Sequence, residues 1–283
     1  MIERLAIVGV GLLGGSLAKA ARAHAIAREI VGIGRDEGRM RPAVTEGTLD
    51  GATTDLAAGL RGADRVVLAA TVLANEHLLP ALWQAAAAGA IVTDVGSTKR
   101  GIVAAAERLV PGRRDVLFVG SHPMAGSEKA GYAVSRADLF QGATVVVTPG
   151  ESSTPAAVKS VSELWSAVGA RVVTLEPEAH DRAVAAISHL PHMVAWALVD
   201  AVARFEPDAF DVAARGFKDT TRIAASDPDV WREILLANRD AVTASVAAFR
   251  VALDDLERLV ARGDGEALTA LLARVKTARE KLS

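Results

Sequence analysis

Short apolar runs alternate with longer mixed segments through the first part of the chain. The runs are rich in branched apolar residues, which is typical of buried strands. Most of the intervening segments carry apolar residues at helical spacing over about 10–15 positions. The predicted strands are Leu5–Val8, Glu29–Ile33, Arg65–Ala70, Ala90–Asp94, Val116–Val119, Thr144–Thr148 and Arg171–Leu175. Strands that alternate with helices favour an α/β fold with a parallel sheet and right-handed crossovers.

The pattern changes after Glu176, where no further strand is expected. Apolar positions recur at helical spacing from Ala183 to Phe205, which predicts one long helix that Pro191 kinks. Two more helical stretches are predicted at Trp231–Val260 and Glu266–Leu282. The second part of the chain is therefore expected to be all-α.

This change of pattern places a domain boundary near residue 175. We expect an α/β domain over residues 1–175 and an all-α domain over residues 176–283. Long helices with apolar stripes favour a homodimer that forms through the second domain. The alternative is a self-contained helical bundle.

Composition narrows the class of protein. Apolar residues make up 51% of the 283 residues, which is enough for a sizeable core. The chain has no cysteine, so disulfides, thiolate catalysis and cysteine-bound metals are excluded. A net charge of −2 gives no reason to expect a nucleic-acid partner. With no targeting segment and no apolar run near the about 18 residues that span a bilayer, we expect a cytoplasmic protein that does not enter a membrane.

A glycine-rich turn directly follows the first predicted strand and opens a helix. It reads Gly9-x-Gly11-x-x-Gly14. In this spacing the first glycine permits a tight turn, the second lets a pyrophosphate approach the backbone, and the third lets the helix pack on the strand. The pattern predicts a Rossmann-type dinucleotide-binding domain, and the alternative is an ordinary strand-to-helix turn. The residues expected to bind the cofactor here are Gly9, Gly11, Leu12, Leu13 and Gly14.

The end of the second strand bears on which dinucleotide binds. NAD enzymes usually carry an acidic residue there, which binds the ribose 2′-hydroxyl. Here glycine takes that position, and Arg35 and Asp36 follow it. Because a guanidinium can pair with a 2′-phosphate, we expect NADP rather than NAD. NAD remains open because Asp36 could reach a hydroxyl, and Arg35 could instead be a solvated residue that stacks on adenine.

A histidine motif follows the predicted strand Val116–Val119. It reads Gly120-Ser121-His122-Pro123-Met124-Ala125-Gly126, and we expect a rigid turn there to hold His122. Open α/β folds place their chemistry beyond the carboxyl ends of the strands. Together with the glycine turn, this motif predicts a dehydrogenase with a histidine at its reacting centre.

Four motifs, in order, carry a resemblance to a known family. They are Asp94-Val95-Gly96-Ser97-Thr98-Lys99, Gly120–Gly126, Ser188-His189-Leu190-Pro191-His192-Met193 and Gly216-Phe217-Lys218-Asp219-Thr220-Thr221-Arg222. From the Gly9 turn to at least Trp231, the chain resembles the prephenate and arogenate dehydrogenases of tyrosine biosynthesis. The resemblance implies oxidation at a ring carbinol with NADP or NAD, coupled to loss of the ring carboxylate. The product would be 4-hydroxyphenylpyruvate from prephenate or tyrosine from arogenate, and the sequence leaves both substrates open.

The resemblance also implies which residues meet the reacting groups. His122 matches the catalytic histidine, which accepts a hydrogen bond from the ring hydroxyl. Ser97 matches an active-site serine close to that histidine and the nicotinamide, although it could also cap a helix that begins near Thr98. Thr71 is expected beside the nicotinamide, although Val72 stands where many relatives have proline.

The substrate-binding residues implied by the family come from the second half of the chain and one loop. They are His189, Arg222, Glu128, Gly216, Asp219 and Trp231, some of them possibly supplied by a partner subunit. Arg222 matches a carboxylate-binding arginine, whose planar fork suits a bidentate contact. The alternatives are a solvated Arg222 or Glu128 and a Trp231 that only packs in the core. His189 and His192 share a helix face, but no acidic third ligand stands at a suitable spacing, so we expect no metal.

Two other functions compete with this interpretation. One is another two-domain Rossmann dehydrogenase of the β-hydroxyacid type. Such enzymes rely on a lysine in the first long helix of the second domain, where this chain has His189 and His192 instead. The other is a non-catalytic nucleotide sensor, which would leave unexplained the set Ser97, His122, His189 and Arg222.

Overall fold

The computed structural model describes residues 1–127 and 129–282 of the chain. By their internal contacts the residues form two compact units, Met1–Asn238 and Arg239–Ser283. The first unit holds the sheet and the first helices that follow it. It extends past residue 175, so the predicted domain boundary at that residue stays a proposal about domain organisation.

An eight-stranded sheet forms the centre of the first unit, in the order β3-β2-β1-β4-β5-β6-β7-β8. The strands are β1 (Ile2–Val8), β2 (Ala27–Ile33), β3 (Gly51–Thr53), β4 (Arg65–Leu68), β5 (Ile91–Asp94), β6 (Leu117–Pro123), β7 (Thr144–Pro149) and β8 (Arg171–Thr174). The strand order reverses between β1 and β4, which is where ligands bind in doubly wound folds. The predicted Rossmann-type α/β class is therefore confirmed.

The sheet differs from the predicted one in two places. Strand β3 was not predicted, because three residues are too few for a hydrophobic pattern. Strands β6 and β7 pair antiparallel, so the expectation of an all-parallel sheet is wrong at this position. The other neighbouring strands pair in parallel.

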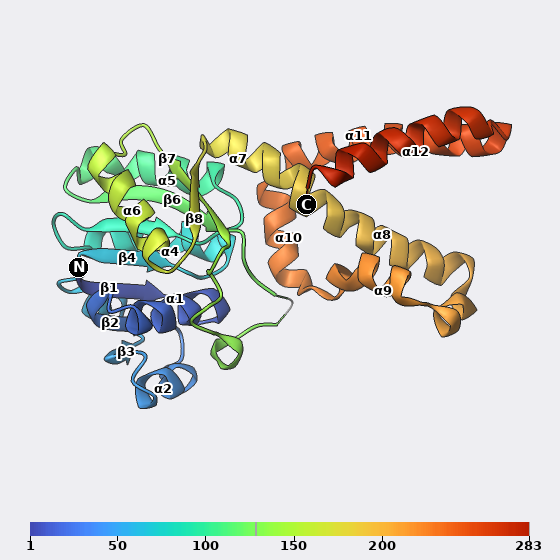
Figure 1. The fold of residues 1–283 in the computed structure, drawn as a ribbon. Coiled ribbons are helices and arrows are strands. Elements are labelled where there is room, and N and C mark those ends of the chain that lie inside the picture. Colours follow the sequence, from blue (N-terminus) through green and yellow to red (C-terminus); the bar gives the residue numbers. More distant parts are fainter. Residues whose placement is uncertain (128, 283) are drawn as a thin grey trace. The chain divides into compact units, whose positions relative to one another are not determined.

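Helices cover both faces of the sheet (Figure 1). They are α1 (Leu12–Ala23), α2 (Glu37–Thr45), α3 (Leu56–Leu60), α4 (Val72–Ala85), α5 (Arg100–Leu109) and α6 (Pro155–Ala167). One buried cluster contains Leu17 of α1 and Trp165 of α6, and the other contains Trp83 of α4 and Ile102 of α5. Because both faces are buried, the strands read as near-continuous apolar runs, which is why the sequence predicted them.

The all-α part of this unit begins with a long, interrupted helix. Helix α7 (Pro177–Val184) passes through a π-helical turn, Ala185–His189, into α8 (Leu190–Phe205). The helix was predicted to be kinked by Pro191, but the irregularity in its hydrogen bonding is the π-turn that precedes Pro191. Pro191 lies in the first turn of α8, where a proline costs little because N–H groups there have no hydrogen-bond partner within the α-helix. Helices α9 (Arg215–Thr221) and α10 (Pro228–Ala237) follow.

The stretch Pro177–Phe205 corrects one expectation. Its length and its mean hydropathy of 1.2 are sufficient for a helix that crosses a membrane, whereas no such stretch was expected. Its many alanine, valine and leucine residues raise the mean although polar side chains interrupt the apolar run. An apolar helix of a globular protein passes the same test, and this one holds buried His180 and Asp181.

The second unit consists of α11 (Arg239–Arg262) and α12 (Gly265–Glu280), which contact each other. The helix predicted over Trp231–Val260 is in fact two helices, α10 and α11, separated at Asn238. The Asn238 side chain is buried and bonds to other parts of the first unit, so the break has a tertiary cause.

Candidate active site

The glycine turn between β1 and α1 has the geometry that a dinucleotide requires. Gly9 has a φ of +101°, and a Cβ there would lie 2.7 Å from the carbonyl group of Ala69. A Cβ on Gly14 would lie 2.1 Å from the carbonyl oxygen of Gly9. A Cβ on Gly11 would meet no described atom within 4 Å, so the backbone there faces open space. No described side chain caps α1 at Gly11, which leaves its first N–H groups available to a phosphate.

The end of β2 presents Arg35 to solvent. The neighbouring Asp36 caps α2, because its carboxylate accepts hydrogen bonds from the backbone N–H of Gly38 at 2.8 Å and of Arg39 at 3.3 Å. One oxygen of Asp36 is therefore already engaged with the start of α2.

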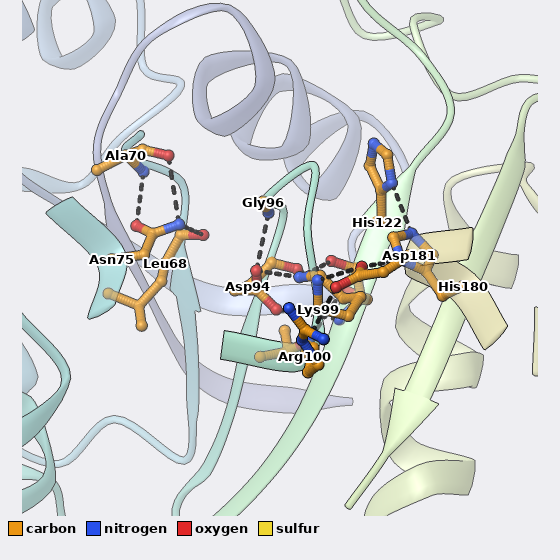
Figure 2. Close-up of polar contacts among 12 residues, drawn as sticks. Leu68, Ala70, Asn75, Asp94, Gly96, Lys99, Arg100, His122, His180 and Asp181 are labelled. Atoms are coloured by element: carbon orange, nitrogen blue, oxygen red, sulfur yellow. Dashed lines mark hydrogen bonds and ion pairs between the residues drawn. The ribbon is translucent and has the colours of Figure 1, made fainter. Parts of the chain in front are cut away.

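The loop between β4 and α4 carries Thr71, which is exposed and precedes the first turn of α4. A fully buried asparagine, Asn75, fixes this loop (Figure 2). Its Oδ1 accepts from the Ala70 N–H at 3.1 Å, and its Nδ2 donates to the carbonyls of Leu68 and Ala70. No sequence pattern singles out Asn75, because asparagine inside a helix is uninformative without its tertiary contacts.

A buried ion pair joins two of the motifs. Lys99 pairs with Asp94 and also donates to the Ser121 carbonyl at 2.9 Å. Asp94 accepts in addition from the backbone N–H of Ser121 at 3.1 Å and of Gly96 at 2.8 Å. Burial lowers the pKa of Lys99, against the opposing attraction of Asp94. These contacts clamp the loop after β5 onto β6, so the Asp94–Lys99 and Gly120–Gly126 motifs form one substructure.

His122 lies within β6, not in a turn after it. It is paired antiparallel opposite Val146 of β7, which corrects the expectation of a rigid turn. Successive side chains of a strand point to opposite faces. The Ser121 hydroxyl accordingly contacts the Trp165 indole N–H at 3.0 Å, while His122 turns toward α7. The ladder with β7, rather than proline and glycine, fixes the position of His122.

A chain of three buried polar groups begins at His122 (Figure 2). Its Nδ1 lies 2.8 Å from Nε2 of His180, and Nδ1 of His180 lies 2.8 Å from Oδ1 of Asp181. Asp181 also accepts from the backbone N–H of Lys99 at 2.8 Å and of Arg100 at 3.0 Å, and so caps α5. Sequence reasoning missed His180 and Asp181, whose only signal was their place at the start of the long helix.

Burial sets the electrostatics of this chain. It lowers the pKa of His122 well below the usual histidine value, and electrostatic interactions with His180, Lys99 and His189 act in the same direction. Burial alone would raise the pKa of Asp181, but hydrogen bonds from the His180 ring and two backbone N–H groups hold that pKa below its ordinary value. The chain therefore has a neutral imidazole, His122, at one end and the ionised carboxylate of Asp181 at the other.

Ser97 lies half-buried in the loop between β5 and α5. Its hydroxyl makes no hydrogen bond to the residues that the structure describes. Helix α5 begins at Arg100 with the Asp181 carboxylate at its first N–H groups, so Ser97 does not cap it. Its hydroxyl is thus available to a ligand.

His189 sits at the end of the π-turn and is 1% exposed. Its Nδ1 lies 3.2 Å from Nδ2 of Asn238, which also donates to the Asp181 carbonyl at 2.7 Å. Burial lowers the pKa of His189 to about 4. Asn238, which the sequence did not single out, thereby links the second histidine to the His122 chain.

An aromatic cluster surrounds the next turn of α8. The rings of His192 and Trp231 stack with centroids 3.6 Å apart, and Trp231 makes edge contacts with His189 and Trp196. His192 donates through Nδ1 to the Ser188 carbonyl at 2.9 Å. Burial lowers the pKa of His192, and the charge of Arg222 adds to the effect, which places Arg222 near this cluster. In the described part of the chain no group of three or more potential ligands could hold a metal ion.

Three of the remaining predicted residues lie on helix α9 or directly after it. Gly216 and Asp219 are on the exposed side of α9, where Asp219 pairs with Arg215 at 3.2 Å. Arg222 is exposed at the end of α9. Glu128 lies outside the described residues.

Comparisons with known proteins agree with this geometry. A family model for the nucleotide-binding domain of prephenate dehydrogenase matches residues 17–174. A second, for the prephenate dehydrogenase dimerization domain, matches residues 176–274. Together they span most of the chain.

Individual relatives cover nearly the full length. Prephenate dehydrogenase of Bacillus subtilis (strain 168) is 35% identical over 100% of this chain and 76% of that protein. The structure of prephenate dehydrogenase from A. aeolicus in complex with hydroxyphenyl propionate and NAD+ superposes with a TM-score of 0.93 at 36% identity, covering 100% of this chain and 99% of that one. Synechocystis arogenate dehydrogenase gives a TM-score of 0.86 at 31% identity, covering 99% and 100%.

The competing β-hydroxyacid type is similar only in fold. The 3-hydroxyisobutyrate dehydrogenase of Salmonella typhimurium has a TM-score of 0.61 at 14% identity. The two family models and the full-length relatives confirm the resemblance that the four motifs indicated. The chain belongs to the prephenate dehydrogenase family of NAD(P)-dependent oxidoreductases.

Proposed function

We propose that this protein oxidatively decarboxylates prephenate or arogenate with NAD(P)+ in tyrosine biosynthesis. The observation that carries the proposal is His122, a buried and neutral imidazole near the carboxyl edge of the sheet that also carries the glycine turn. A neutral imidazole can accept the proton of a ring hydroxyl, which is what oxidation of a carbinol requires.

The reaction needs one base and an acceptor for two electrons. His122 takes the proton of the ring hydroxyl through its second ring nitrogen, because its Nδ1 is bonded to His180. A bound NAD(P)+ would supply the acceptor for the hydride that leaves the ring carbon bearing that hydroxyl. The bond to the ring carboxylate then breaks, CO2 leaves, and the electron pair of that bond makes the ring aromatic. His122 returns its proton to the phenolate oxygen, so no net proton is consumed.

Other residues bind and orient the reactants. Gly11 and the first N–H groups of α1 hold the pyrophosphate, where the structure shows open backbone. Ser97 and Thr71 lie beside the nicotinamide, and Ser97 offers a hydroxyl without a described partner. His189 and Arg222 bind the substrate. The Arg222 guanidinium pairs with the carboxylate on the substrate's side chain. The family resemblance adds Trp231, Gly216, Asp219 and Glu128 to this pocket.

The cofactor preference proposed here is NADP. Its support is Arg35, exposed after β2, together with the engagement of the adjacent Asp36 in the cap of α2. Arg35→Ala should weaken NADP+ binding about tenfold or more and leave NAD+ binding unchanged, since only NADP+ carries the phosphate. Titration calorimetry measures both, with the exposed Arg61→Ala as the control. An equal loss of affinity for NAD+ and NADP+ would show that Arg35 instead stacks on the adenine ring, which both cofactors carry.

The proposed assembly is a homodimer that forms through the helices after residue 175. Large apolar side chains are exposed on these helices in the single chain: Ile187, Phe205, Val251, Leu253, Val260, Leu272 and Val275. Large exposed apolar side chains on helices of this kind are typical of surfaces that a partner covers. Light scattering should give twice the 29.4 kDa of one chain, and a monomer would refute the assembly. The proposal also places the protein in the cytoplasm, with no nucleic-acid or membrane partner.

The decisive experiment follows reduced-nicotinamide absorbance with purified protein, crossing prephenate and arogenate against NAD+ and NADP+. Turnover in any combination confirms the reaction and identifies the pair. His122→Asn should lower kcat by about 100-fold or more, the range for loss of a general base, with cofactor affinity intact. No turnover in all four combinations, from folded protein that binds nucleotide, would refute the proposed function.

A further inference from the structure

We propose that His180 and Asp181 act as positioning residues that hold His122 in a single tautomer, with its proton on Nδ1 and a free lone pair on Nε2. The catalytic meaning of this inference rests on the proposed function. The tautomer itself is a property of the protein alone and can be measured without substrate.

The assignment starts at Asp181, which has unambiguous donors. Its Oδ1 lies 2.8 Å from the backbone nitrogen of Lys99, and its Oδ2 lies 3.0 Å from that of Arg100. A backbone N–H can only donate, so both carboxylate oxygens act as acceptors. The same Oδ1 lies 2.8 Å from Nδ1 of His180 and accepts from it as well. His180 therefore carries its proton on Nδ1.

The proposal takes the direction one ring further. In its neutral form the His180 ring has one N–H and one lone pair, so with its proton on Nδ1 the ring accepts at Nε2. His122 Nδ1 lies 2.8 Å from that atom and must donate to it. Burial lowers the pKa of His122 well below its usual range and keeps the ring neutral. The lone pair of His122 is left on Nε2, which is the atom that can take the substrate proton.

The same chain stabilises the ring once it has taken that proton. An imidazolium donates a stronger hydrogen bond than a neutral ring, and the Asp181 carboxylate supplies a negative charge one ring further along. The other charged and titratable groups that act on His122 are His180, Lys99 and His189. Lys99 is paired with Asp94, whereas Asp181 bonds directly to the His180 ring and supplies its negative charge to the histidine chain.

Tertiary packing holds this arrangement in place. His122 comes from β6, whereas His180 and Asp181 come from α7, and Asp181 is fixed by the start of α5. His180 is fully buried, so solvent does not compete for its ring nitrogens. Groups that orient a reacting histidine in this way change its reactivity without touching the substrate.

The first test is NMR of the ligand-free protein with 15N-labelled histidine, which distinguishes a protonated from a bare ring nitrogen. Wild-type His122 should show a protonated Nδ1 and a bare Nε2. In Asp181→Asn one of the two acceptor oxygens becomes an NH2 group, so the N–H groups of Lys99, Arg100 and His180 compete for a single oxygen. His180 is then no longer held with its proton on Nδ1, and His122 should lose its single tautomer. A bare Nδ1 in wild-type His122, or an unchanged tautomer in Asp181→Asn, would overturn the proposal.

The second test separates a positioning role from a merely structural one. His180→Gln keeps an acceptor for His122, whereas His180→Phe removes it. We expect kcat to fall about 100-fold or more in His180→Phe and Asp181→Asn, but within about tenfold in His180→Gln, with KM and cofactor affinity near wild type in all three. The acid limb of the pH profile should move to lower pH in His180→Gln, because the protonated His122 loses the support of Asp181. His24→Gln, an exposed histidine at the end of α1, is the matched control.

The outcomes distinguish this inference from the proposed function. Wild-type protein with the expected tautomer but no turnover on either substrate would refute the function and leave the tautomer assignment standing. Wild-type kcat in His180→Phe or Asp181→Asn, with substrates that the native enzyme does turn over, would refute the positioning role. If a variant does not fold, the wild-type spectrum still decides the tautomer.

Discussion

Two single-methyl substitutions in the glycine turn should separate its structural role from its binding role. The first is Gly14→Ala. The new Cβ would lie 2.1 Å from the Gly9 carbonyl oxygen and 3.0 Å from side-chain carbons of both Ala69 and Ile7. These neighbours are a backbone atom, the Cβ of partly buried Ala69 and the fully buried Ile7, so none can rotate away. Since the contact with Gly9 is more than about 1 Å too short, α1 must move away from β1.

The cost of that movement can be estimated. Forcing a methyl group into a packed interior destabilises a protein by about 1–3 kcal/mol. For a chain of this size, that corresponds to a melting temperature lower by about 2–12 °C. Because the start of α1 also forms the phosphate site, the affinity for NAD(P)+ should fall about tenfold or more in the same variant.

The matched variant is Gly11→Ala. Its Cβ would meet no described atom within 4 Å, so the folded protein should keep its melting temperature to within about 2 °C. The methyl group would nevertheless occupy the open space that the pyrophosphate must enter. The affinity for both cofactors should therefore fall about tenfold or more, although the protein remains as stable as wild type.

Scanning calorimetry and titration with NAD+ and NADP+ measure the two effects independently. Undiminished cofactor affinity in Gly11→Ala would show that the pyrophosphate does not approach this backbone and would falsify the placement of the cofactor. A Gly14→Ala protein as stable as wild type would show that α1 can shift freely, which would refute the packing argument.

Two further predictions concern the substrate pocket and the buried histidine. Arg222→Lys should raise the substrate KM about tenfold with little change in kcat, because lysine cannot make the bidentate carboxylate contact. Steady-state kinetics tests this, with Arg232→Lys as the control. An unaltered KM would show that the substrate carboxylate binds elsewhere. His189 has a pKa of about 4 in the folded protein, below its ordinary 6.5, so the unfolded chain binds more protons as pH falls from about 6.5 to about 4, and stability is lost over that window. Between pH 7.5 and pH 5, urea unfolding should show wild type losing about 2 kcal/mol more than His189→Gln, and equal losses would mean that His189 is not held neutral.

Much of the fold could be predicted because its signals are local. The apolar runs of β1, β2, β4 and β5 are short, and helices bury both of their faces, so the hydrophobic pattern alone identifies them. The glycine turn was equally accessible, because three backbone requirements within six positions leave a fixed spacing. His122 and Ser97 were found through short motifs, although the motif gave no information on what fixes their geometry.

The sequence by itself therefore determined the α/β class, the dinucleotide turn and the family, since each depends on residues close together in the chain. Tertiary structure alone decided that β7 runs antiparallel to β6 and holds His122 in the sheet. It also decided that Asp181 of α7 caps α5 and orients His180 against His122. His180 and Asp181 are ordinary polar residues in the sequence, and only packing between distant elements buries them. Because no water competes for these buried groups, each hydrogen bond in the chain has one donor and one acceptor, so the direction of donation is fixed. No local sequence pattern indicates this burial.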